Sequence, residues 1–402
     1  MTSSSARNIP DIALSPVPKD YTLLAENFDW WQEALDMKMP QSLWDEMKAA
    51  KEKAIELDDR RKTPIDFKFG GEDFQIMPTG GAGGKEFILI NADLRFEFSS
   101  RNRSYSVGWR ATAAGLWEYG LEELIKRVFT ILHFEGFKED SENWRKLSRV
   151  DYAFDIEAES FTAEMVPEIV RQVICPKECK ARGDFYVRNM RVETLTVGSL
   201  KGCQVQIYDK GLEITEISGK TWMIDIWMEN GYAPEIRNGK PICKNVWRLE
   251  VRMAGDWLKN RNVKQPNEFL DNMWPLITEG LYSRRLTKRV GHDSNRSRWP
   301  LHSLYSLAVK TCGNETRFLP VGYQTTEKSK VLQKMIVAQI AGSLRSLAVL
   351  RLRGALDGEM VFDMSEVDKA IKEASEVLEN DEDHHKKILK AKERYALVDE
   401  AR

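Results

Sequence analysis

The sequence has few cysteines and few histidines for its length. Its 402 residues include five of each, and no two histidines form a His-x-His pair. The cysteines are odd in number and lack the regular spacing of a disulfide framework, which is typical of reduced thiols in a large intracellular protein. A disulfide-stabilised secreted fold is therefore not indicated.

Long apolar runs and a strong net charge are also missing. No stretch of about 18 apolar residues occurs, and the first 20 residues lack the basic-then-apolar order of a signal peptide. We therefore expect a cytoplasmic protein without a membrane partner. The formal net charge is only −2, so the chain as a whole is not a basic nucleic-acid binder.

The charges that are present are unevenly distributed. Residues 284–298, here called the basic segment, contain six basic residues and one acidic residue. Residues 357–383 contain eleven acidic residues and two lysines. This asymmetry predicts an anion-binding body followed by an acidic tail.

The pattern along the chain predicts an α+β fold, with a central antiparallel sheet and flanking helices forming one domain and a helical C-terminal region after it. Residues 1–20 are rich in Ser and Pro, which predicts a disordered tail. Residues 21–60 are expected to form an N-terminal helical segment, and residues 61–300 the α+β domain. Residues 301–402 are expected to be helical with an acidic tail.

Three predicted strands, at 149–156, 203–210 and 246–253, each have one apolar and one polar face. Side chains alternate with period two along a strand, so each polar set points to one side. If these strands are neighbours, a single surface collects carboxylates, cations and one tyrosine. The residues expected there are Arg149, Asp151, Asp155, Gln204, Gln206, Tyr208, Lys210, Arg248, Glu250 and Arg252.

This polar face has an ordinary and a functional interpretation. Many antiparallel sheets leave one face in water, and charged residues there need no function. Three such strands in succession leave both interpretations open, and the chemistry that uses this mixture of residues is phosphodiester transfer. In that chemistry carboxylates hold a divalent cation, a tyrosine hydroxyl attacks phosphorus, and Arg or Lys neutralises the developing charge.

Four motifs along the chain resemble those of the replication initiation factor family, in the same order. They are RVDYAFD at 149–155, TLTVGS at 194–199, QIYDKGLE at 206–213 and WRLEV at 247–251. The family comprises rolling-circle initiators of small plasmids and related relaxases of conjugative elements. The resemblance covers roughly residues 90–300.

The resemblance implies specific roles for several residues. Tyr208 matches the nicking nucleophile, Asp151 and Glu250 match active-site or metal carboxylates, and Glu213 matches an acidic position that acts as a base or positions water. Without a His-x-His pair, metal binding would rest on carboxylates, with Mg²⁺ or Mn²⁺ as the cofactor. The expected catalytic residues are Tyr208, Lys210, Glu213 and Arg248, and the expected metal ligands are Asp151, Asp155 and Glu250.

The expected function is nicking of one strand at a double-strand origin, with a 5′-phosphotyrosine link and a free 3′ hydroxyl. Origin DNA, a host helicase and a DNA polymerase are the implied partners, and a homodimer is possible. The alternatives are a conjugative relaxase with the same chemistry and a non-enzymatic, sequence-specific DNA-binding protein. The basic segment is either a solvated surface or a phosphate-binding one. Its candidate DNA-binding residues are Arg284, Arg285, Lys288, Arg289, Arg296 and Arg298.

Overall fold

The structure is a computed structural model. It describes residues 12–57, 64–100, 103–161, 172–175, 184–188 and 191–312, with a few positions between 368 and 375. The chain divides into one unit of Arg7–Val321 and a second unit of Met1–Ala6 with Gly322–Arg402. The fold described below is that of the first unit.

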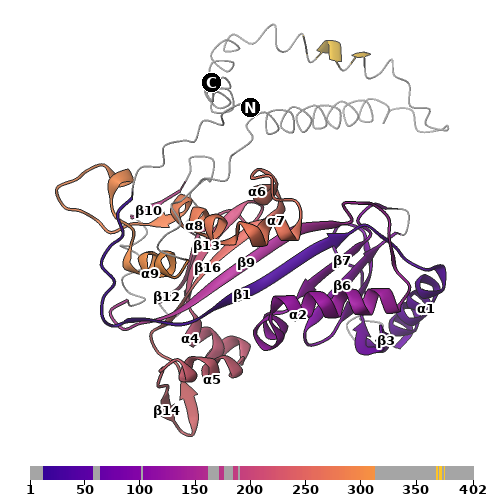
Figure 1. The fold of residues 1–402 in the computed structure, drawn as a ribbon, viewed down its shortest axis with the longest axis horizontal. Helices are drawn as coiled ribbons and strands as arrows, with labels where there is room; N and C mark the ends of the chain where they lie inside the picture. Colours follow the sequence, from indigo (N-terminus) through magenta and orange to yellow (C-terminus); the bar gives the residue numbers. More distant parts are fainter. Residues whose placement is uncertain are drawn as a thin grey trace. The chain divides into compact units, whose positions relative to one another are not determined.

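An 11-stranded sheet organises this unit, and every pair of neighbouring strands in it is antiparallel. Two long strands, β1 (Tyr21–Leu35) and β9 (Arg145–Ala158), run side by side through its middle (Figure 1). On the β9 side follow β16 (Val246–Ala254), β13 (Cys203–Asp209), β12 (Arg191–Gly198) and β11 (Asp184–Arg188). On the β1 side follow β7 (Val107–Ala111), β6 (Leu94–Ser99), β5 (Lys85–Ile90), β4 (Glu72–Ile76) and β3 (Ile65–Phe69).

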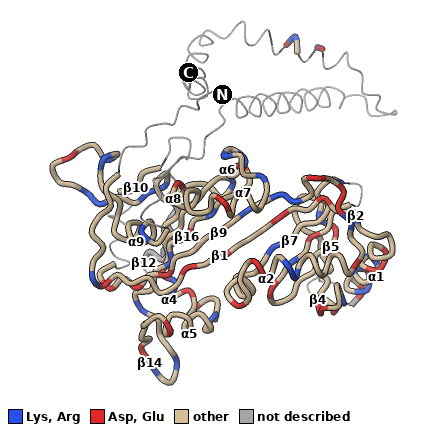
Figure 2. Tube along the Cα trace, in the orientation of Figure 1, with Lys and Arg blue, Asp and Glu red and all other residues tan. Residues whose placement is uncertain are grey.

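In the part of the chain that the structure describes, three short strand pairs lie outside this sheet. They are β2 (Met37–Lys38) with β8 (Lys138–Glu139), β10 (Val173–Ile174) with β17 (Arg285–Leu286), and the hairpin of β14 (Glu235–Arg237) with β15 (Lys240–Ile242) (Figure 2).

Helices flank the sheet at both ends. The first, α1 (Gln41–Leu57), and α2 (Ala113–Phe134) pack near the β3–β7 half, and Gly120 interrupts α2 with a φ of 75°. The segment after β13 contains α4 (Lys210–Leu212), the π-helix η2 (Glu213–Ser218) and α5 (Trp222–Glu229). The others are α6 (Gly255–Lys259), α7 (Pro266–Asp271), α8 (Met273–Ser283), η3 (Arg296–Arg298) and α9 (Ser303–Thr311). The predicted α+β class, a central antiparallel sheet with flanking helices, is confirmed.

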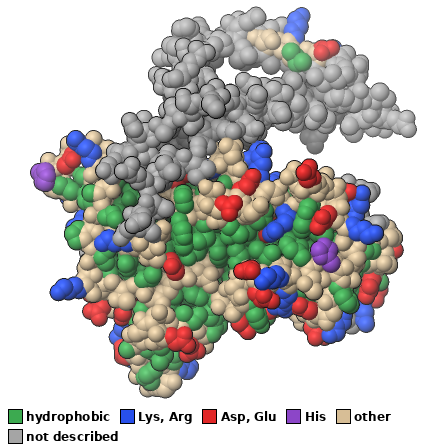
Figure 3. Space-filling view, viewed as in Figure 1, with side chains coloured by type: hydrophobic (Ala, Val, Ile, Leu, Met, Phe, Trp, Pro, Cys, Tyr) green, Lys and Arg blue, Asp and Glu red, His purple; other side chains and the backbone are tan. Residues whose placement is uncertain are grey.

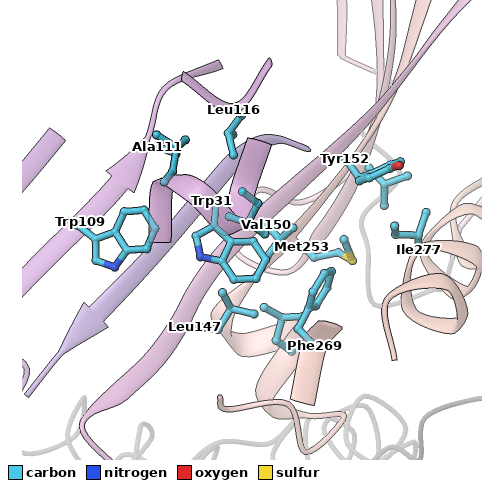
Figure 4. Close-up of a cluster of buried hydrophobic side chains, with 14 of the residues drawn as sticks. Trp31, Trp109, Ala111, Leu116, Leu147, Val150, Tyr152, Met253, Phe269 and Ile277 are labelled. Atoms are coloured by element: carbon cyan, nitrogen blue, oxygen red, sulfur yellow. The ribbon is translucent and has the colours of Figure 1, made fainter. Parts of the chain in front are cut away.

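One face of the sheet builds the main hydrophobic core. Trp31 of β1 lies opposite Val150 of β9 in the strand register, and α7 closes over them through Phe269, whose ring centroid is 5.9 Å from that of Trp31. Figure 4 shows these side chains together with Trp109 of β7, so both halves of the sheet share one core. In Figure 3 hydrophobic side chains gather in the middle of the visible face, and charged ones lie mostly around it.

The structure corrects two predictions for the N-terminal region. Residues 21–35 form the long strand β1, so of the described residues in the segment 21–60 only those of α1 are helical. Residues 12–20, predicted to be part of a disordered tail, lie against the domain: Ile12 is buried, and Leu14 forms a β-bridge with Leu301. In the predicted helical region 301–402, Ser303–Thr311 form α9, and most of the rest lies outside the described residues.

Candidate active site

The three strands predicted to carry polar residues are neighbours in the sheet, in the order β13, β16, β9. The strand register sets Tyr208 opposite Arg248, and Arg248 opposite Asp155. Two residues further along the same strands, Gln206 lies opposite Glu250. Directly paired residues of an antiparallel sheet point to the same side, so these side chains share one surface, which we call the polar face.

The polar face is not a solvated surface at its centre. Part of it is covered by α5, whose Trp227 indole donates a hydrogen bond of 3.0 Å to Asp155 Oδ2. Together with Ile214 of η2, Met223 and Trp227 belong to a second hydrophobic cluster. The charged residues beneath or beside this cover expose almost nothing: Asp155 0%, Arg248 1%, Glu250 1% and Asp151 2%.

Arg248 is held by two carboxylates. Its Nε and Nη2 atoms donate to Asp155 at 2.6 and 2.8 Å, and Nη1 donates to Asp29 at 2.7 Å. Asp29 comes from β1, at a register shift between Phe28 and Trp30. Burial acts to raise the pKa of Asp29, but the charges of Arg248 and Lys210 outweigh it and the pKa is lowered. Sequence reasoning missed Asp29, because a bulge breaks the alternation that would assign it to the polar face.

Tyr208 donates a hydrogen bond of 3.2 Å from its hydroxyl to Glu250 Oε2. Burial raises the pKa of Tyr208 well above its ordinary value; Arg248 opposes this effect and Glu250 adds to it. The hydroxyl therefore keeps its proton at neutral pH. An attack by this oxygen would need a base, and Glu250 is the carboxylate in hydrogen-bond contact with it.

The residues after Tyr208 form a sharp turn from strand into helix. Asp209 caps α4 by accepting a 2.9 Å hydrogen bond from Leu212 N. Only glycine fits at position 211, because the Cβ atom of any other residue would lie 2.4 Å from the Cys243 carbonyl oxygen. The sequence places Lys210 on the strand, but the structure makes it the first residue of α4.

Lys210 and Glu213 are paired with each other beside the tyrosine. Lys210 Nζ lies 2.6 Å from Glu213 Oε2 and 5.7 Å from the centroid of the Tyr208 ring. Burial lowers the pKa of Lys210, Arg248 lowers it further, and Glu213 opposes both. Glu213 therefore contacts a cation next to the nucleophile candidate, whereas the hydroxyl itself contacts Glu250.

Asp151 and Glu250 are each balanced by an arginine. Arg149 donates to both oxygens of Asp151, at 2.8 and 2.5 Å, and Arg252 Nε donates to Glu250 Oε1 at 2.7 Å. Arg252 Nε also lies 3.8 Å from Asp151. Burial, with a further contribution from Glu250, raises the pKa of Asp151 to about 7 despite Arg149.

This donor chemistry fits a divalent cation at Asp151 and Glu250. Two buried carboxylates that repel each other are stabilised by a shared positive charge, and Mg²⁺ is commonly held by one or two carboxylates with water and substrate phosphate. The oxygens of Asp155 are occupied by Arg248 and Trp227. Those of Asp151 accept from Arg149, and those of Glu250 accept from Arg252 and Tyr208, so a cation bound there would have to displace one of these donors. Within the described ranges, no group of three or more His, Cys, Asp or Glu residues is arranged to hold a metal.

The basic segment is divided between buried and exposed arginines. Arg284 and Arg285 are only 6% and 9% exposed, so they are poorly placed for contact with a phosphate. A cavity of about 560 Å³ lies in the loop that follows, lined in part by Arg289, Arg296 and Trp299. The four remaining candidates are exposed: Lys288, Arg289, Arg296 and Arg298.

These features define an α+β protein with a tyrosine, carboxylates and arginines clustered on one sheet. No family model matches the sequence, and no curated protein matches it significantly. The fold is similar to the solved structure of a rolling circle replication initiator protein from Geobacillus stearothermophilus. The two are 14% identical with a TM-score of 0.40, and the match covers 73% of this chain and 98% of that one. So distant a likeness does not determine a function.

None of the helices in the described part of the chain is both long enough and apolar enough to cross a bilayer.

Proposed function

We propose that this protein nicks one DNA strand at a replication origin and thereby initiates rolling-circle replication. The hydrogen bond from the Tyr208 hydroxyl to Glu250, within a buried set of paired carboxylates and guanidiniums, carries this proposal. The order of the motifs at 149–155, 194–199, 206–213 and 247–251 supports it.

In the proposed reaction the Tyr208 oxygen attacks a backbone phosphorus. A bond forms between that oxygen and phosphorus, and the bond from phosphorus to the 3′ oxygen breaks. The tyrosine proton passes to Glu250, and the departing 3′ oxygen takes up a proton from solvent to become a hydroxyl. The 5′ phosphate stays covalently joined to Tyr208, and the 3′ hydroxyl is available to a DNA polymerase.

The surrounding charges have assigned roles in this proposal. Arg248 is fixed in position by Asp155 and Asp29, so it is preorganised to stabilise negative charge that develops on the phosphate. Asp151 and Glu250 would hold Mg²⁺ or Mn²⁺, which when bound supplies polarisation of a phosphoryl oxygen. Lys210 adds positive charge beside the tyrosine ring.

The same proposal implies three partners, which are the origin duplex, a helicase and a DNA polymerase. The exposed cations of the basic segment would bind phosphates of the origin duplex, because Lys and Arg supply the salt-sensitive part of DNA affinity. A helicase would open the duplex beyond the nick, and a DNA polymerase would extend the 3′ hydroxyl.

Covalent attachment to DNA tests the proposal. Supercoiled DNA carrying the chain's own locus is incubated with the protein and Mg²⁺ or Mn²⁺, and nicks and protein–DNA adducts are mapped. Tyr208→Phe should bind DNA but form no adduct, since it loses only the attacking oxygen. The matched control is Tyr152→Phe, which removes a hydroxyl from the opposite face of the same sheet and should leave the adduct yield unchanged.

Two results would contradict the proposal. A normal adduct yield from Tyr208→Phe would assign the nucleophile to another residue. Specific binding by the unaltered protein without any nick or adduct, under all metal conditions, would indicate a DNA-binding protein without nicking activity.

A further inference from the structure

A tryptophan stacked between two arginines extends the polar face into the other half of the sheet. Trp30 of β1 has the guanidinium carbon of Arg110, on β7, 4.2 Å from its ring centroid, and that of Arg149, on β9, 4.6 Å away. The Trp30 indole also donates a 3.1 Å hydrogen bond to Gln32, which keeps the ring in place. Such stacking fixes the plane of a guanidinium without neutralising its charge.

The positive charge in this region is not fully compensated. Arg149 is paired with Asp151, and Arg95, which lies opposite Arg110 in the strand register, is paired with Glu97 at 2.8 Å. Arg110 forms no ion pair with any residue that the structure describes. Burial lowers the pKa of Arg110, repulsion from Arg95 and Arg149 adds to this effect, and the charge of Glu97 opposes it. A bound anion would relieve that repulsion.

These residues are continuous with the candidate active site. Trp30 lies opposite Asp151 in the strand register, so both belong to the polar face. Between the strand of Tyr208 and that of Arg110 lie β16, β9 and β1, which makes four strand spacings or roughly 19 Å. We call this set of residues the arginine strip: Trp30, Arg95, Arg110 and Arg149.

We propose that the arginine strip binds the phosphodiester backbone of the unpaired DNA strand that Tyr208 attacks. This inference rests on the proposed nicking function and names a second contact for the same substrate. Guanidinium forks match phosphate oxygens in geometry and charge. Arginine and tryptophan side chains in series are also typical of surfaces that follow an unpaired strand, where their planes stack with bases.

Binding measurements in a Tyr208→Phe background test the strip separately from the chemistry. Fluorescence anisotropy with a labelled single-stranded oligonucleotide spanning the nick gives affinity at several salt concentrations. Arg110→Gln should weaken binding about tenfold, as expected for one lost charge-assisted contact. It should also reduce the slope of log affinity against log salt by about 0.7. Arg110→Lys keeps the charge, so it should keep that slope and lose less affinity.

The matched control is Arg237→Gln, the same chemical change on the exposed β14–β15 hairpin. It should bind the oligonucleotide as the parent protein does, and thermal unfolding checks that each variant is folded. Equal binding by Arg110→Gln and Arg237→Gln would overturn the inference. An equal loss on a fully duplex oligonucleotide of the same length would overturn the assignment to an unpaired strand.

The adduct assay distinguishes failure of the strip from failure of the nicking function. If protein that retains Tyr208 forms the adduct, but Arg110→Gln binds the single-stranded oligonucleotide as tightly as its parent, the inference fails and the nicking function stands. If Arg110→Gln weakens binding but no protein forms an adduct, the DNA contact stands and the nicking function fails. If the unaltered protein binds no single-stranded DNA, both are overturned.

Discussion

Replacing Glu250 by Gln tests which carboxylate acts as the base for the tyrosine. Glu250 Oε2 accepts the Tyr208 hydrogen bond at 3.2 Å, whereas the Glu213 carboxylate contacts Lys210 at 2.6 Å. A positioned general base contributes about 10²–10⁴ in rate, or roughly 3–5 kcal/mol of barrier. We therefore expect Glu250→Gln to slow cleavage by at least about a hundredfold, and Glu213→Gln by less than about tenfold.

Single-turnover cleavage of an end-labelled oligonucleotide at saturating protein measures this step. The rate is followed over a range of Mn²⁺ concentrations, because Glu250 is also a metal-ligand candidate. A loss that persists at saturating Mn²⁺ supports the role as base, and a loss that high Mn²⁺ restores supports the role as ligand alone. If Glu213→Gln lost a hundredfold while Glu250→Gln stayed within tenfold, the assignment made here would be wrong.

Four further outcomes are expected. Arg248→Gln leaves the buried Asp155 without its partner, so chemical denaturation should show a loss of about 3–5 kcal/mol in unfolding free energy. Burial lowers the pKa of His302 to about 4, below an ordinary value of about 6.5. The unfolded chain therefore takes up this proton first, and up to about 3 kcal/mol of stability should be lost as pH falls from about 6.5 to 4, an effect absent in His302→Asn. Asp151→Asn should raise the Mn²⁺ concentration needed for half-maximal cleavage without changing DNA affinity. Replacing the four exposed cations of the basic segment by alanine should flatten the salt dependence of duplex binding by up to about 0.9 per lost contact; an unchanged slope would show a solvated surface.

Where side chains alternate regularly, the sequence predicts the structure well. The faces of β9, β13 and β16 follow from period two alone, because Val150 and Ile207 point to the core while Asp151 and Tyr208 do not. The adjacency of these strands was a condition of the functional hypothesis, and the sheet order satisfies it.

The prediction failed where the period is interrupted. Strand β1 pairs with β9 through three register shifts, and its apolar residues do not alternate cleanly, so period two does not mark the segment as a strand. That error concealed Asp29 and Trp30, which reach the polar face from β1.

The sequence pattern also could not predict that the polar face is buried. A strand with alternating charged residues looks the same whether water or another element covers it. Only the fold brings Trp227, more than 70 positions away from Asp155 along the chain, into contact with that carboxylate. The buried positions of Arg284 and Arg285 similarly depend on tertiary packing and not on the local run of charge.

Mass spectrometry of the covalent adduct tests the central claim most directly. The protein is incubated with an oligonucleotide spanning the mapped nick in Mn²⁺, digested with nuclease and protease, and the modified peptide is sequenced. We predict a single 5′-phosphonucleotide linked to the oxygen of Tyr208. A modification on any other residue, or none in a preparation that does cleave the DNA, would contradict the assignment of Tyr208 as the nucleophile.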